Sequence, residues 1–168
     1  MKKYRYVGPK EIEKYGQSDI VRICLESSDS VLSWIQQTGQ QEDMNGEITA
    51  TYIVDTTGKM WITDRHYEHV ACARGLQVLS AGEISFSFEN NSVEVSYLSN
   101  QSTGYCPEPD SWTAVQNALT STGLPFPNSW SKEFHFRRCS SCLSINVVKD
   151  DVYICAVCNS DLDLKWNF

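Results

Sequence analysis

The sequence predicts an α+β fold, with a mixed or antiparallel sheet, flanking helices and a small cysteine-rich module at its C-terminal end. Three observations support this expectation. Helical patterns enclose stretches of strand-like pattern within the first 130 residues. Clusters of turn-forming residues separate these stretches. Two C-x-x-C pairs follow residue 138. We therefore expect an α+β domain over residues 1–130 and a compact module over residues 131–168.

Three segments have the pattern and capping residues of helices. Residues 9–15 begin with proline, which is favoured in the first turn of a helix. A serine or aspartate at 28–29 can cap a second helix, which Gly39 ends. An aspartate or serine at 110–111 can cap a third helix, which Gly123 ends. These helices flank the predicted strands on both sides of the sequence.

Between the second and third helices the pattern changes to that of strands. Residues 48–54 and 60–63 form a predicted hairpin, and residues 78–88 and 93–98 form a second strand pair that turns at 89–91. The polar, turn-rich segment 36–46 is a predicted loop. Residues 64–75 are compatible with a helix that ends at the glycine.

Composition and charge restrict the classes of partner. A length of 168 residues with 41% hydrophobic residues is sufficient for a buried core. The net charge of −7 is uneven: residues 1–14 carry +3, residues 15–130 carry −10, and residues 131–168 are neutral. A strongly acidic main domain repels phosphate backbones, so nucleic acid is not an expected partner. The basic side chains Lys132, His135, Arg137 and Arg138 are the exception to this pattern, and a solvated surface is the simpler interpretation of them.

The sequence also predicts a cytoplasmic protein that does not enter a membrane. No apolar run approaches the roughly 20 residues that a membrane helix needs, and the basic start lacks an apolar signal segment behind it. Seven cysteines without a signal peptide argue for reduced thiols and against a secreted disulfide framework. Cys24, in an apolar stretch, is expected to be a buried small hydrophobe.

The strongest motif is the set of four cysteines at 139, 142, 155 and 158. Cys139 and Cys142 form one C-x-x-C pair, Cys155 and Cys158 form the other, and twelve residues separate the pairs. This spacing resembles that of zinc ribbons, in which two turns each present two thiolates to one tetrahedral metal. We expect residues 145–148 and 152–154 to pair as a hairpin between them. Such a ligand set is complete, so the resemblance implies a structural Zn²⁺, with iron in a rubredoxin-like site as the alternative metal.

Reactive side chains are also concentrated between residues 64 and 110. The shared feature is acid–base or nucleophilic chemistry, and the candidate catalytic residues are His66, Glu68, His69, Glu83, Tyr105 and Cys106. Glycine and proline around Cys106 indicate a shaped loop after a strand, where functional sites are common. The alternative interpretation makes residues 103–105 a simple turn and the histidines exposed residues on a polar helix face.

The layout of this region resembles that of the zinc-dependent nucleobase deaminases, which carry H-x-E and P-C-x-x-C motifs. The resemblance implies His66 as a metal ligand, Glu68 as the general acid/base and Cys106 as one thiolate. The chain departs from the second motif, because Tyr105 occupies the proline position and Pro109 the position of the second cysteine. An ADP-ribosyltransferase-like site is another possibility, with Arg65 or His69, Ser102-Thr103 and Glu108 in a plausible order.

A further resemblance covers residues 66–107. The pattern is similar to a segment of plant IQ-motif calmodulin-binding proteins and of some bacterial effector-like proteins, which have S-G-H-Y-x-P where this chain has S-T-G-Y-C-P. The matching positions are His66, Gly75, Val78, Ala81-Gly82-Glu83, Ser99-Asn100, Ser102, Gly104-Tyr105 and Pro107. The resemblance implies a common domain and a common ligand site. The chain has no IQ motif, so it does not imply calmodulin binding.

These observations predict an intracellular zinc-binding protein that acts as a binding or adaptor module for a protein or small-molecule partner. The alternative is an enzyme with a deaminase-like or ADP-ribosyltransferase-like site within residues 64–110. Convergence of the candidate residues in one concave site would favour the enzyme, and scatter would count against it.

Overall fold

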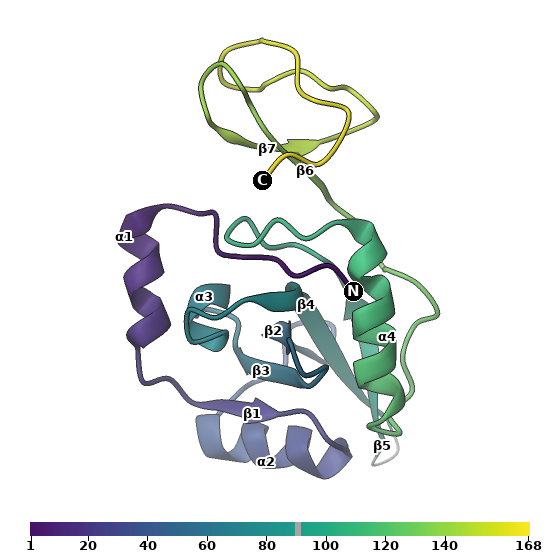
Figure 1. Ribbon diagram of the computed structural model, residues 1–168. Helices are drawn as coiled ribbons and strands as arrows, with labels where there is room; N and C mark the ends of the chain where they lie inside the picture. The colour runs from purple at the N-terminus through teal and green to yellow at the C-terminus, as the bar shows by residue number, and fades with distance from the viewer. Residues whose placement is uncertain (90–91) are drawn as a thin grey trace.

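The main body of the protein is built on one antiparallel sheet. The computed structural model describes residues 1–89 and 92–168. Five strands lie in the order β1-β3-β2-β4-β5 (Figure 1). They are β1 (Arg22–Cys24), β2 (Glu47–Asp55), β3 (Met60–Asp64), β4 (Val78–Glu89) and β5 (Ser92–Leu98). All their pairings are antiparallel, which confirms the predicted α+β fold.

Short helices flank this sheet. They are α1 (Lys10–Glu13), the 3₁₀ turn η1 (Lys14–Gln17), α2 (Ser28–Thr38), α3 (His69–Cys72), the 3₁₀ turn η2 (Pro109–Ser111) and α4 (Trp112–Thr120). The predicted helices beginning near residues 28 and 110 are confirmed, and Gly39 ends α2 in the left-handed conformation at φ 66°. In the described part of the chain, no helix combines the length and apolar character that a membrane crossing requires.

Both faces of the sheet are covered. On one face, α2 and α4 bury Trp34, Val115 and Leu119 against Tyr52 and Phe86. The other face is covered by α3 and by residues at both ends of the body, where Tyr4, Val70, Ile53, Val78 and Tyr105 form a second cluster. Alternate side chains of a strand point to opposite faces, which places the adjacent residues Tyr52 and Ile53 in different clusters.

The helix predicted over residues 64–75 is wrong in extent. Only α3 is helical, because Asp64 starts a turn in place of a helix. Its carboxylate accepts the His66 N–H at 2.8 Å, and its carbonyl oxygen accepts the Tyr67 N–H at 3.0 Å. Arg74 and Gly75 have φ values of 54° and 73°, and they end the segment. The side-chain hydrogen bonds of aspartate compete with helix formation in this way.

Two further expectations concern the edges of the sheet. Strand β1 was not predicted, and it pairs with β3 at one edge. The expectation that Cys24 is buried is wrong, because this residue is half-buried on that edge strand. The predicted turn at 89–91 includes residues 90 and 91, which lie outside the described residues.

A second, two-stranded sheet belongs to the C-terminal module. It consists of β6 (His135–Arg138) and β7 (Ile145–Val148), which pair antiparallel. The predicted pairing of residues 145–148 with 152–154 is therefore wrong. The first cysteine pair reverses the chain between β6 and β7, so the partner of β7 precedes that pair. The predicted turn is present, and an isolated bridge between Lys149 and Val152 closes it.

The first residues of the chain lie between the body and the cysteine-rich module (Figure 1). We call residues 2–8 the N-terminal segment. Tyr4 forms an isolated bridge with Val78 of β4. The Val7 N–H donates to the Gly104 carbonyl oxygen at 2.7 Å. From the module, Arg138 Nη2 donates to the Val7 carbonyl oxygen at 3.1 Å. The N-terminal segment is thus held from both sides.

The last residues close over the same segment. The Trp166 indole N–H donates to the Cys106 carbonyl oxygen at 2.8 Å. Lys2 Nζ lies 3.3 Å from the centroid of the Trp166 ring, and the Tyr4 ring meets that ring edge-on at 5.7 Å between centroids. A cation and an aromatic edge therefore both contact the indole.

Candidate functional site

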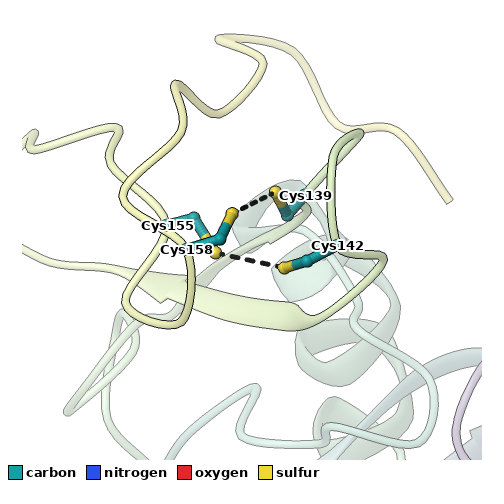
Figure 2. Close-up of side chains that lie close together, drawn as sticks. All are labelled: Cys139, Cys142, Cys155 and Cys158. Atoms are coloured by element: carbon teal, nitrogen blue, oxygen red, sulfur yellow. Dashed lines mark hydrogen bonds between the residues drawn. The ribbon is translucent and has the colours of Figure 1, made fainter.

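The four cysteines of the C-terminal module meet at one point. Their Sγ atoms all lie within 4.8 Å of one another. Two contacts join the pairs crosswise: Cys139 to Cys158 and Cys142 to Cys155, each at 3.6 Å between sulfur atoms (Figure 2). A disulfide bond would place two sulfurs about 2.05 Å apart. All four are therefore free thiols gathered around a common centre.

The same local fold builds each half of this cluster. Cys139 N–H donates to the Ser144 carbonyl oxygen at 2.9 Å, and Leu143 N–H returns to the Cys139 carbonyl oxygen at 2.9 Å. In the second half, Cys155 N–H donates to Ser160 at 2.8 Å, and Asn159 N–H returns to Cys155 at 3.0 Å. Leu143 and Asn159 both have left-handed φ values, 64° and 59°. Two matched turns therefore present two sulfurs each.

The donors fit a tetrahedral metal ion. A metal–sulfur distance of about 2.3 Å implies sulfur–sulfur edges of about 3.8 Å, close to the 3.6 Å contacts. Hydrogen bonds favour the thiolate form of Cys155. The Ser144 hydroxyl lies 3.3 Å from Cys155 Sγ, and the Val157 N–H donates to it at 3.4 Å. The Ser144 bond, followed by the backbone N–H groups, outweighs desolvation and lowers the pKa of Cys155 to about 5. The cluster can bind a metal ion.

This ligand set is complete and stands alone. Among residues 1–89 and 92–168, it is the one group of three or more histidine, cysteine or acidic side chains that can hold a metal. His66 and Cys106, the two metal ligands that the deaminase resemblance implies, do not belong to a second such group, so the described residues do not assemble a deaminase-like metal centre. Four protein ligands leave no open position on a tetrahedral ion.

One arginine of the basic cluster is structural. Arg137 is buried, and its guanidinium donates to the carbonyl oxygens of Phe136, Asp163 and Leu164 at 2.7, 3.0 and 2.7 Å. It fastens the final residues to β6. Its neighbour Arg138 donates to Val7 and Leu143. Both side chains were expected on a solvated surface, whereas these hydrogen bonds show that they stabilise the fold.

A surface depression of about 190 Å³ brings four of the candidate catalytic residues together. His66, Glu68, His69 and Glu83 line what we call the polar depression. Thr51, Arg65, Gln101 and Thr103 also contribute to its walls. Thr51 and Gln101 were missed at the sequence level. The register between β2 and β4 would have identified Thr51, because it places Thr51 directly opposite Glu83.

His69 is the most constrained member of this group. Its Nε2 lies 3.0 Å from the Gly82 carbonyl oxygen. Burial lowers the pKa of His69 to about 4, an effect that the Gly82 hydrogen bond only partly offsets. The ring is therefore neutral at pH 7, and Nε2 carries the proton that it donates to Gly82. Nδ1 is then an acceptor. The other histidine, His66, directs Nδ1 to the Asp64 carboxylate at 2.7 Å.

Tyr105 and Cys106 do not line the polar depression. Tyr105 is buried and donates its hydroxyl to the Leu76 carbonyl oxygen at 2.8 Å. The Cys106 thiol is buried 3.3 Å from the Thr103 carbonyl oxygen, and burial raises its pKa to about 12. A thiol in this environment is protonated and inert at neutral pH. Both side chains hold the loop over residues 102–106 against the body.

The residues assigned by the ADP-ribosyltransferase-like interpretation are also distributed. Glu108 forms an ion pair with Lys2 at 2.6 Å. The buried Ser102 hydroxyl accepts the Tyr105 N–H at 3.3 Å. Arg65, His69 and Thr103 remain together in the polar depression. Three residues of the ADP-ribosyltransferase-like interpretation therefore lie together, whereas Ser102 and Glu108 make contacts that stabilise the fold.

No protein-family model matches this chain, and no curated protein or solved structure matches it significantly.

Proposed function

We propose that this protein is an intracellular zinc-binding module whose metal is structural and whose activity is to bind a partner, as an adaptor does. The observation that carries the proposal is the closed set of four thiols, with all Sγ atoms within 4.8 Å of one another. When bound, Zn²⁺ would hold the two cysteine turns together and leave catalysis to other parts of the chain.

The remaining cysteines support a reducing compartment. Cys24, Cys72 and Cys106 are all free, and no disulfide contributes to the described part of the protein. Zinc thiolate sites and reduced, buried cysteines are typical of intracellular proteins. The division at residues 130 and 131 belongs to the same proposal, with the body and the module as separate units joined by the N-terminal segment.

The surface of the module supports partner binding. It exposes large apolar side chains, which a purely structural clip does not need: Leu143, Val152, Ile154, Val157 and Leu164, each at least 44% exposed. Large apolar side chains that a small module leaves exposed are available to a partner.

Metal content tests the structural part of this proposal. The purified, reduced protein should contain one equivalent of Zn²⁺ by elemental analysis. Cys142→Ser should lose it, because three thiolates bind less tightly than four. Cys24→Ser, outside the module, is the matched control and should retain the metal.

Other metal contents would contradict the proposal in distinct ways. Iron with the colour of a ferric thiolate centre would replace Zn²⁺ as the resident metal. Unchanged metal affinity in Cys142→Ser would show that Cys142 is not a ligand and would contradict the four-thiolate site.

The second candidate is an enzyme that uses the polar depression. The observation in its favour is the convergence of His66, Glu68, His69 and Glu83 in one concave site. Neutral His69 and the two carboxylates are suited to general acid–base chemistry. The same elemental analysis addresses its deaminase-like form: a second equivalent of Zn²⁺, lost in His66→Ala, would favour the enzyme. A single equivalent would count against that form.

A further inference from the structure

A second concave site lies beside the polar depression. This slot, of about 380 Å³, shares His66, Tyr67 and Glu68 with it. We call it the tyrosine slot, because Tyr15 of η1 forms one wall and Tyr67 of the β3–α3 loop forms another. Ile20 and Ala71 supply apolar surface. The two tyrosine side chains are 45% and 47% exposed, so both rings can meet a ligand.

The walls of the tyrosine slot are fixed by close packing. Gly16, next to Tyr15, is buried, and a Cβ there would stand 2.8 Å from the Gly75 Cα. This contact seats η1 directly on the chain that follows α3. The Tyr67 backbone is held at both ends, with its N–H on the Asp64 carbonyl oxygen at 3.0 Å and its own carbonyl oxygen accepting the Thr51 hydroxyl at 3.2 Å. The rings are therefore presented from anchored backbone.

The electrostatics of the tyrosine slot favour a cation. With His66 counted as neutral, Glu68 carries the one full charge among the described residues that line it. Lys14 Nζ lies 5.6 Å from the centroid of Tyr15, so this ring contacts a cation in the folded protein, and a ligand ammonium group would take the place of Lys14 there. Residues 15–130 carry a net charge of −10, which steers basic partners toward the body.

We propose that the tyrosine slot binds a lysine side chain of a basic segment in a partner protein. In this proposal the ammonium group contacts the exposed rings of Tyr15 and Tyr67 and is balanced by Glu68. The aliphatic stem lies against Ile20 and Ala71. A ring face, a carboxylate and an apolar wall together match the three parts of an alkylammonium side chain. This inference rests on the proposed role as a binding module, and it gives that module a class of partner.

The test is a titration of the full-length, metal-loaded protein followed by amide chemical shifts. The probes are capped tetralysine, capped tetraglutamate and spermidine. Tetralysine should shift the amides of residues 15–20 and 66–71 and should bind more weakly as salt is raised. Tyr67→Ala and Glu68→Gln should each weaken binding by about two- to fivefold, as expected for partly exposed cation–π and ion-pair contacts. Tyr67→Phe should bind normally, because the ring face and not the hydroxyl makes the contact.

The matched control is Glu94→Gln, which removes one exposed carboxylate from β5 and should leave tetralysine binding unchanged. Tetralysine shifts that spread over the acidic surface and survive Tyr67→Ala would overturn the proposal, since they indicate non-specific attraction. Binding of spermidine at the slot without binding of tetralysine would contradict the proposal that the ligand is a lysine side chain of a protein. Equal binding of tetraglutamate would overturn the charge argument. Metal content is measured separately, so failure of the slot is distinguishable from failure of the zinc proposal.

Discussion

Gly82 illustrates how a single residue shapes the polar depression. A Cβ at this position would stand 1.9 Å from the Ser99 carbonyl oxygen, so the residue after β5 passes directly over the β4 backbone. No side chain fits there. The close approach leaves the Gly82 carbonyl oxygen available to the His69 ring at 3.0 Å. A glycine with no chemistry of its own thereby sets the tautomer of a histidine.

His69 should make stability depend on pH. The pKa of His69 is lowered from 6.5 to about 4 in the folded protein, so the unfolded chain takes up a proton first as the pH falls. The stabilising contribution is fully present above about pH 6.5 and is lost as the pH falls toward 4. Between pH 7.5 and 5.5 this loss amounts to about 1 kcal/mol for one group of this shift. Urea unfolding at both pH values, with saturating Zn²⁺, measures it.

His69→Gln is the matched variant, because its amide can still donate to Gly82 but does not titrate. It should show a shallower decrease in stability between the two pH values than the parent protein does. Identical decreases in both proteins would mean that the His69 ring is hydrated in the folded state.

At the scale of elements, the sequence determines most of the body. The β2–β3 hairpin, β4, β5, α2 and α4 have local patterns and end signals, and these elements form where those patterns lie. Strand β1 has only three residues, and all three are partly buried. Alternation of apolar and polar residues therefore has too few positions to indicate a strand. Strand β7 could pair with the segment before the first cysteine pair or with the segment after it. It pairs with β6, which lies before that pair, and the spacing of the cysteines does not distinguish the two possibilities.

The candidate site was only partly predictable for a similar reason. Residue types and clustering identified His66, Glu68, His69 and Glu83, which the fold brings together. Tyr105 and Cys106 have equally reactive side chains, but they point into the body, and their orientation depends on loop packing over residues 102–106. The tyrosine slot brings together Tyr15 and Tyr67, which are far apart in the sequence. No local sequence pattern indicates that they are close in space.

Asn100 connects three separate parts of the chain through its side chain. Its Nδ2 donates to the Pro107 and Phe134 carbonyl oxygens, both at 2.8 Å, and its Oδ1 accepts the Phe134 N–H at 2.7 Å. The side chain is fully buried. It therefore joins three elements: the end of β5, the loop before η2 and the chain entering β6.

Replacing this residue should separate those elements. Asn100→Ala leaves three backbone groups without partners and should lower the free energy of unfolding by about 2–4 kcal/mol. Its exposed neighbour gives the control, since Gln101→Ala should change stability by no more than about 0.5 kcal/mol. Denaturant titration compares the two. Equal effects would indicate that the hydrogen bonds of Asn100 are replaced by water.

For the whole molecule, the metal site and the start of the chain are coupled. The cysteine-rich module contacts the N-terminal segment and the loop over residues 102–106 by way of Arg138 and Trp166. It also contacts the end of β5, where Phe134 binds Asn100. The four thiols hold the second cysteine turn, and with it the final residues, against β6. Loss of the metal should therefore release the N-terminal segment before it affects the sheet.

Hydrogen exchange should detect this order. After chelation, the amide of Val7, which donates to Gly104 at 2.7 Å, should exchange faster, whereas amides of β2 and β4 in the centre of the sheet should stay protected. Trp166→Ala with metal bound should reproduce part of the change at Val7. Simultaneous loss of protection at Val7 and in β2 would show instead that body and module unfold as one cooperative unit.

The position of the N-terminal segment also has a consequence for biosynthesis (Figure 1). Residues 2–8 leave the ribosome before the strands and the cysteines do, yet Val7 is paired with Arg138, 131 positions later, and Lys2 stacks on Trp166. The nascent chain can form the β2–β3 hairpin and the rest of the sheet while its first residues are still without those partners. The N-terminal segment is then placed last, once the cysteines have emerged. Metal capture would thus be the closing event of folding and not its nucleus.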